Sequence, residues 1–184
     1  MRIFLYLLSI VVANVITAKF APLVLGVFII PMGTLFIGAT FILRDLVQMR
    51  HGRKKTYMII FTALIISGIV SYLLGDTLMI VAASALSFIV AETADTEIYT
   101  RLKLPIPWRV FYSGLVGGFL DSVVFIVIGL SPIGANILPW AAIPGAIAGQ
   151  IMAKTLVQMI GALILNQVYQ IRGKRITKNS YKLS

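Results

Sequence analysis

The sequence predicts an all-α integral membrane protein, a six-transmembrane-helix bundle with both termini in the cytoplasm. Three observations support this: an apolar composition, six apolar runs of helical length, and basic residues that collect on one side of those runs. Of the 184 residues, 59% are hydrophobic and 12% are charged, whereas a soluble domain is roughly 45–50% apolar and about 25% charged. This composition excludes an ordinary soluble domain. It also excludes a disordered chain, because disorder requires low hydrophobicity.

The six apolar runs are close to the length of a transmembrane helix, which needs about 20 residues. They are Ile3–Ala18, Leu23–Leu43, Tyr57–Leu74, Thr77–Ala94, Val110–Leu130 and Pro139–Tyr169. We therefore expect a single six-helix transmembrane domain over residues 1–170 and a basic cytoplasmic tail over residues 171–184. A cleaved signal peptide is the alternative for the first run, which follows Arg2, but Asn14 within it favours a retained helix.

Basic residues indicate how the helices are oriented. They cluster in Arg50–Lys55, in Arg101–Arg109 and in the tail from Arg172 to Lys182. In a six-span arrangement, 14 of the 16 lysines and arginines lie on one side, and the exceptions are Lys19 and Lys154. Because positively charged loops stay in the cytoplasm, both termini and the two basic loops are placed there, in a multi-pass protein of the cell (inner) membrane.

The net charge of +10 is explained by this topology. We expect the tail to hold anionic lipid headgroups, and we expect no nucleic-acid partner. The chain has no cysteine and a single histidine, His51, so disulfides, thiolate catalysis and cysteine-ligated metals are excluded and a histidine metal cluster is not expected. It also has no glycine loop of the ATP-binding kind. No cofactor, metal site or enzymatic activity is predicted.

Charged side chains inside the apolar runs need a reason, because each costs about 2.5–3.5 kcal/mol near the bilayer centre on insertion scales. Asp121 lies about 16 Å along a helix from the start of the fifth run, near the middle of the membrane, and Ser122 follows it. Gln150, Lys154 and Gln158 are spaced by four, so they share one face of the last helix. Such a polar stripe is not expected to face lipid.

Other helices carry polar groups as well. Glu92 and Asp95 share a face of the fourth helix at a spacing of three, Asp45 ends the second helix, and Asn14 sits within the first. Four or five of the six helices thus turn polar groups toward one shared volume. The candidate substrate-binding residues are Asn14, Asp45, Glu92, Asp95, Asp121, Ser122, Gln150, Lys154 and Gln158.

Two interpretations of these groups are open. They form internal ion pairs that only hold the bundle together, Asp121 with Lys154 and Asp45 with a neighbouring arginine, or they line a cavity for a polar substrate. Hydrogen bonds between membrane helices average about 0.6 kcal/mol, a small return for burying charge, which favours the cavity. Its aromatic neighbours would include Phe36, Phe41, Tyr99 and Trp140. A planar, N–H-rich base, an amino compound or a cation would suit such a cavity.

Six short segments, taken in order, carry a family resemblance. They are Asn14, Ile30-Pro31, Arg44-Asp45-Leu46, Glu92-Thr93-Ala94-Asp95, Gly117-Gly118-Phe119-Leu120-Asp121-Ser122 and Gln150–Lys154. In these segments the chain resembles the vitamin uptake transporter family, which includes the queuosine-precursor transporters. The resemblance covers most of the chain. It implies import of 7-cyano-7-deazaguanine or 7-aminomethyl-7-deazaguanine for making queuosine in tRNA.

The resemblance implies a small planar heterocyclic base of the 7-deazaguanine type as the binding partner within the lipid bilayer. By analogy with base recognition, a carboxylate would accept hydrogen bonds from the ring N–H and the exocyclic amine. We expect Asp121 or Asp95 in that role, and Gln150 or Gln158 on the carbonyl side. Lys154 would balance the acids. The sequence leaves open whether the bundle forms a homo-dimer.

Other function classes are weighed against this one. The substrate-binding subunit of an energy-coupling-factor transporter would need an Ala-x-x-x-Ala face on its first helix, but Ala13 and Ala18 are five apart. A membrane enzyme would use Glu92, Asp95 and Glu97, with Asp45, to bind a divalent metal, but their spacing matches no metal motif. A purely structural or hole-forming protein needs no buried acids. Transport would be facilitated, ion-coupled or powered by a separate subunit.

Overall fold

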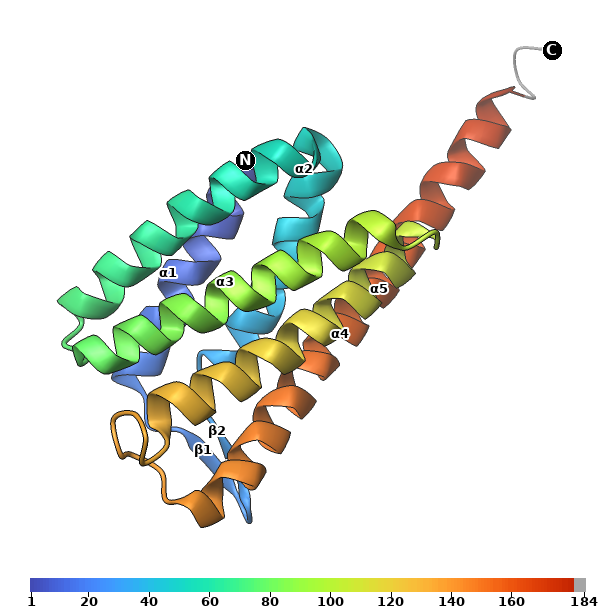
Figure 1. Ribbon diagram of the computed structural model, residues 1–184. Helices are drawn as coiled ribbons and strands as arrows, with labels where there is room; N and C mark the ends of the chain where they lie inside the picture. Colours follow the sequence, from blue (N-terminus) through green and yellow to red (C-terminus); the bar gives the residue numbers. More distant parts are fainter. Residues whose placement is uncertain (181–184) are drawn as a thin grey trace.

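The computed structural model describes the backbone of residues 1–180 and the side chains of residues 1–171. Over this range it contains five helices that are long and apolar enough to cross a membrane. They are α1 (Arg2–Lys19), α2 (Thr34–Leu73), α3 (Leu78–Arg101), α4 (Ile106–Val124) and α5 (Ile143–Ser180). Figure 1 shows them as a single bundle beyond which the end of α5 projects. The expected all-α membrane architecture is confirmed, and the predicted domain boundary at residue 170 stays a prediction because the last tail residues lie outside the described part.

The longest helix, α2, is divided at Gly52. This residue has φ 77° and ψ 168°, a conformation that only glycine adopts readily. The chain reverses direction at this point, so the two halves of α2 run past each other in opposite senses (Figure 1). The halves correspond to the second and third apolar runs of the sequence. One glycine therefore separates two helical segments without a loop between them.

A short β-hairpin replaces the predicted start of the second helix. Strands β1 (Leu23–Leu25) and β2 (Phe28–Ile30) pair antiparallel, and Leu23 lies opposite Ile30. The prediction of a helix beginning at Leu23 is therefore wrong for about the first half of that run. The physical reason is that Gly26 adopts φ 61° in the turn and Pro31 disfavours helical geometry at the residue before it, so α2 begins only at Thr34.

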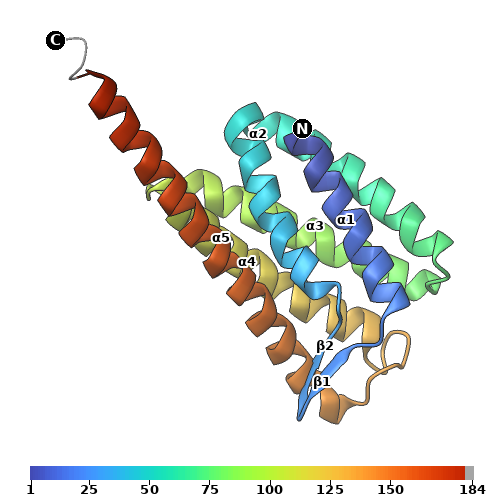
Figure 2. The ribbon, with the colours of Figure 1, turned by 180° about the vertical axis from the view of Figure 1, so that it is seen from behind.

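The hairpin is held at the start of α5, as Figure 2 shows. Two glycines one turn apart in α5, Gly145 and Gly149, lie against it. A Cβ atom at Gly149 would stand 2.9 Å from Cγ1 of Ile30 and 3.2 Å from Cβ of Phe28, and one at Gly145 would collide with the carbonyl of Val27. The absence of side chains on this face of α5 lets the strands approach its backbone.

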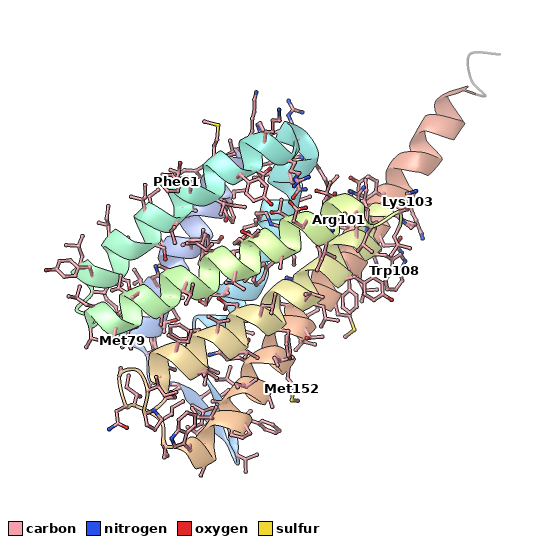
Figure 3. The ribbon with its side chains drawn as sticks, in the orientation of Figure 1. Phe61, Met79, Arg101, Lys103, Trp108 and Met152 are labelled. Atoms are coloured by element: carbon pink, nitrogen blue, oxygen red, sulfur yellow. The ribbon has the colours of Figure 1, made fainter. Side chains whose placement is uncertain are left out.

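The bundle has two chemically different ends. One end, called here the basic end, contains the bend of α2 and the turn between α3 and α4, where Arg101 and Lys103 are seen in Figure 3. The other, called the hairpin end, contains the hairpin, the turn between α2 and α3, and the loop of residues 131–139. The last turn of α4 widens toward the hairpin end into a π-helical segment, Phe125–Leu130. A 3-10 turn, Trp140–Ala142, then leads into α5.

The outer surface is apolar and much of the interior is polar. Phe61, Met79, Trp108 and Met152 are all exposed on the outside of the helices (Figure 3). Exposed apolar patches this extensive are rare on soluble proteins, but a bilayer requires them. The first helix belongs to the bundle, because it buries Tyr6, Ile10 and Ala13 against its neighbours.

Gly52→Ala should destabilise the protein, because an alanine there must adopt a conformation that costs about 1–3 kcal/mol. Gly68→Ala is the matched control, since Gly68 lies in regular helix in the second half of α2. Neither position has an atom within 4 Å of an added Cβ, so only the backbone differs. The melting temperature in detergent should fall for Gly52→Ala and stay or rise for Gly68→Ala. Equal melting temperatures would show that the bend does not require glycine.

Candidate functional site

A cavity of about 280 Å³ opens near the hairpin end, between all five helices; we call it the main cavity. Of the nine candidate residues, Asn14, Asp121 and Gln150 line it. The other lining residues are Thr17, Ala18, Phe20, Pro22, Pro31, Thr34, Ile37, Ser71, Asp76, Ile80, Ser84, Ser87, Phe125, Leu130 and Ile137. Most of the wall is apolar. The polar groups among the lining residues therefore decide what the cavity can orient.

Lys154 of α5 lies directly behind this wall and binds two of its polar groups. Its Nζ stands 2.6 Å from Oδ2 of Asp121, 3.1 Å from Oε1 of Gln150 and 2.8 Å from Oγ of Ser122. The lysine is almost fully buried, while the Asp121 side chain keeps 13% of its surface exposed. The ion pair between Asp121 and Lys154, which the less favoured interpretation of the sequence named, is present, and Asp121 also lines the cavity. This lysine fixes the orientation of the carboxylate and the amide that face the cavity.

Asn14 joins the first helix to the second half of α2. Its Nδ2 donates to Oγ of Ser67 at 2.9 Å and to the Ser67 carbonyl at 3.3 Å. Thr17 and Ala18 follow on the same side of α1 and also line the main cavity. Asn14 is thus both a helix contact and part of the cavity wall.

A second group of charges lies deeper in the bundle, around Arg44 of α2; we call it the Arg44 network. The guanidinium forms ion pairs with Asp45 at 3.1 Å, with Glu92 at 3.1 Å and with Asp95 at closer range. Its Nη1 also donates to Gln48 and Thr96, each at 3.0 Å. Arg44 and the three acids are at most 1% exposed. The pairing of Asp45 with an arginine, which the less favoured interpretation of the sequence also named, is present, and that arginine is the residue before it.

Hydrogen bonds extend the Arg44 network to a third helix. Ser113 of α4 donates to Oδ2 of Asp45 at 3.3 Å, and Gln48 donates to Thr100 at 2.9 Å. Gly117 of α4 also lies close to the network, because a Cβ there would stand 3.0 Å from Cβ of Asp95. The first half of α2, α3 and α4 therefore meet around one guanidinium.

Six of the nine candidate residues do not line the main cavity. Asp45, Glu92 and Asp95 face Arg44, while Ser122 and Lys154 lie behind the wall. Gln158 is fully buried nearer the basic end, where its Nε2 donates to the Gly38 carbonyl at 3.0 Å.

A second pocket, of about 330 Å³, lies on the far side of the Arg44 network; we call it the basic-end pocket. It is lined by Gln48, Met49, Arg53, Tyr99, Thr100, Ile106 and Arg109. Along α2 the order is Ile37 of the main cavity, then Arg44, then Gln48 of this pocket. Along α3 it is Ser87, then Glu92 and Asp95, then Thr100. The Arg44 network therefore lies between the two pockets.

The expected aromatic neighbours of the cavity are wrong. Phe36 and Trp140 are exposed on the outside, Phe41 is buried without lining the cavity, and Tyr99 lines the basic-end pocket instead. The rings on the cavity wall are Phe20 and Phe125. Sequence reasoning missed them because Phe20 follows the end of α1 and Phe125 begins a π-helical segment, which shifts the face that a residue presents.

Further polar residues of the cavity were missed, among them Thr17, Thr34, Ser71 and Asp76. Ser71 donates a hydrogen bond to the carboxylate of Asp76 at the turn between α2 and α3. Asp76 sits next to Gly75 in what the sequence presents as an ordinary tight connection. The nearest sequence signal is a pair of serines spaced by three, Ser84 and Ser87, which begins about two helical turns after that connection.

The glycines of α4 serve packing within the chain. A Cβ at Gly114 would stand 2.5–2.6 Å from the side-chain amide of Gln158, and one at Gly118 would stand 3.4 Å from Cβ of Lys154. Within the described residues, no group of three histidine or acidic side chains is arranged to hold a metal ion. The three clustered acids surround a guanidinium.

Arg44→Gln should cost about 3–5 kcal/mol of stability, because it leaves buried carboxylates without their cation. Arg53→Gln is the matched control, since Arg53 pairs with Glu97 but is half exposed and should cost less than about 1 kcal/mol. Thermal unfolding of both variants in detergent measures the difference. Similar melting temperatures for the two variants would mean that the acids do not depend on Arg44.

A comparison with protein families places these features in context. Residues 70–168 match the vitamin uptake transporter family, and this range includes α3, α4 and the cavity residues Asp121 and Gln150. No curated protein and no solved structure matches the chain. The match covers more than half of the sequence and agrees with the membrane-spanning helices and the cavity between them. The chain belongs to the vitamin uptake transporter family and is a multi-pass membrane protein of a transporter family.

Proposed function

We propose that this protein is a transporter of the cell (inner) membrane that imports 7-cyano-7-deazaguanine or 7-aminomethyl-7-deazaguanine. The main cavity is the proposed binding site. The family supports a transport function for a small molecule, and the resemblance in the polar segments supports this substrate class. A cavity of about 280 Å³ is near the lower limit for ligand sites, which suits a small bicyclic base.

The observation that carries the proposal is the fixed pair of polar groups on the cavity wall. Lys154 binds Oδ2 of Asp121 and Oε1 of Gln150. Oδ1 of Asp121 is therefore the proposed acceptor, and Nε2 of Gln150 is the proposed donor. A guanine-like edge offers N–H donors beside a carbonyl acceptor, which is the complement of this pair. Of the alternatives open in the sequence, Asp121 and Gln150 are thus preferred over Asp95 and Gln158.

The remaining candidate residues have different proposed roles. Asn14 adds an amide to the wall, and Phe20 and Phe125 offer faces on which a flat ring can stack. Ser122 and Lys154 hold the polar pair in position. Asp45, Glu92, Asp95 and Gln158 are proposed to close the path between the main cavity and the basic end rather than to contact the substrate.

We also propose that the chain crosses the membrane six times, with both termini and the basic end in the cytoplasm. The reversal of α2 at Gly52 supports two crossings by this helix. The bend carries Arg50, Arg53, Lys54 and Lys55, and the turn between α3 and α4 adds Arg101 and Lys103. Positively charged segments of this kind stay in the cytoplasm. In this orientation the main cavity opens to the outside.

Asp121→Asn should abolish or strongly reduce import, because an amide has a single acceptor oxygen, which cannot serve both Lys154 and the substrate, and it carries no charge to pair with the lysine. The measurement is the queuosine content of tRNA in a bacterium that can neither make nor import the precursor, supplied with nanomolar 7-cyano-7-deazaguanine. Gln150→Ala should reduce import as well, since it removes a donor from the wall.

Met152→Leu is the control for these variants, because Met152 lies two residues from Gln150 but faces outward. It should restore queuosine as the unmodified chain does. Absence of queuosine with the unmodified chain, when the protein is present in the membrane, would overturn the substrate assignment. Normal import by both Asp121→Asn and Gln150→Ala would overturn the assignment of the site.

Single cysteines test the six-crossing topology cleanly, because the chain has no cysteine of its own. Lys54→Cys and Lys103→Cys should react with a membrane-impermeant maleimide only after the cells are permeabilised. Ile133→Cys, in the exposed loop after α4, should react in intact cells. If α2 crossed the membrane only once, the labelling would be reversed: residue 103 would react in intact cells, and residue 133 only after permeabilisation.

A further inference from the structure

The Arg44 network contains more negative than positive charge. Asp45, Glu92 and Asp95 together face one guanidinium, so the group would carry a net charge of −2 if every member were ionised. All four side chains are at most 1% exposed. Water therefore cannot screen the excess charge in this conformation.

The surrounding groups do not supply the missing positive charge. Tyr6 of α1 lies beside Glu92, Asp121 of α4 lies on its cavity side, and Tyr99 of α3 lies on the side of Asp45. Arg109 stacks on Tyr99 and donates to its carbonyl, and Lys154 is engaged by Asp121. Among the described residues, Arg44 is the only cation that forms ion pairs with the three acids.

A buried acid without a counter-charge usually becomes neutral by taking up a proton. Outside the ion pairs of the network, the buried Oδ1 of Asp95 has no hydrogen-bond donor, and the buried hydroxyl of Tyr6 has no partner other than the neighbouring Glu92. A carboxylate oxygen without a donor can carry a proton, and the Tyr6 hydroxyl can donate to or accept from Glu92 in either protonation state of that acid. The excess negative charge and these two atoms are independent observations, and both indicate that the network binds protons.

The position of the network allows such protons to reach both sides. It separates the main cavity from the basic-end pocket, and Gln48 belongs both to the network and to the lining of that pocket. On the opposite side of the network, Ser87 lines the main cavity and lies five residues before Glu92 in α3, which is little more than one helical turn. Opening either pocket toward the network would hydrate the acids.

We propose that Asp45, Glu92 and Asp95 form a proton-binding site, and that protons passing through it from the main cavity to the basic end drive import of the substrate. The inference rests on the proposed function for the coupling step only. With the main cavity open, the acids hold protons and Arg44 closes the path. When the basic-end pocket opens, the acids are hydrated and release protons to the cytoplasm with the substrate. Two protons bring the network to neutrality.

The first experiment tests proton occupancy without any substrate. Infrared spectra of the purified full chain at neutral pH should contain the C=O stretch of a protonated carboxylic acid, shifting on exchange into heavy water. Glu92→Gln and Asp95→Asn should each reduce this band. Glu97→Gln should leave it unchanged, because Glu97 lies at the surface end of the same helix, paired with Arg53 and Arg101. Absence of the band from the unmodified chain would overturn the proposal.

The second experiment tests coupling in proteoliposomes that contain only this chain. The probe is radiolabelled 7-cyano-7-deazaguanine, chosen because its nitrile adds no titratable amine. With the membrane potential clamped at zero, an inward gradient of about one pH unit should support about tenfold accumulation per coupled proton, and about a hundredfold if both protons of the network are coupled. Substrate addition should also acidify the lumen, as reported by an enclosed dye. Glu97→Gln should behave like the unmodified chain, whereas Glu92→Gln should lose the dependence on the pH gradient.

Exchange of labelled for unlabelled substrate without a gradient separates the two proposals. If the unmodified chain exchanges the probe but a pH gradient neither raises accumulation nor acidifies the lumen, coupling is overturned and the proposed function stands. If it exchanges no probe, the substrate assignment is overturned, and the infrared band then decides the proton-binding site. Should Glu92→Gln fail to give a monodisperse protein, Asp95→Asn is measured in its place.

Discussion

The ion pairs of Arg44 are the interaction on which the interior of this protein depends. Three carboxylates cannot remain in the middle of a membrane bundle unless a cation and hydrogen-bond donors satisfy them. Arg44 brings Glu92 and Asp95 of α3 to the first half of α2, and Ser113 brings α4 to the same point. Gly117 lets α4 approach closely enough to complete the contact. The charges thus determine which faces of three helices turn inward.

A second, smaller ionic group sets the geometry of the cavity. Lys154 lies outside the cavity wall, yet it holds both Asp121 and Gln150, the polar groups proposed to meet the substrate. One polar atom of each group accepts a hydrogen bond from the lysine, and this bond fixes the direction of the group's other polar atom. Any change at Lys154 should therefore alter recognition even though the lysine itself does not line the cavity. The two ionic groups together form successive layers between the hairpin end and the basic end.

Part of the site could be predicted because charge inside an apolar run is rare and costly. The pairs of Asp121 with Lys154 and of Asp45 with an arginine follow from that cost, and so does the inward face of Gln150, Lys154 and Gln158. The cavity itself could not be predicted residue by residue. Phe20, Phe125 and Asp76 reach it from a helix end, a π-helical segment and a tight turn, where helical periodicity no longer tells which way a side chain points.

From the sequence alone it follows that this protein lies in a membrane, that its helices carry polar groups inward, and that the buried acids need partners. These follow from composition and from the cost of charge in lipid, which do not depend on the details of packing. The packing of the folded chain was needed to show that residues 23–30 form a hairpin on the glycine face of α5. It was also needed to show that the acids divide into one group at the cavity and one around Arg44. The reason is that several partners satisfy a buried charge equally well, and only the packing of distant helices selects among them.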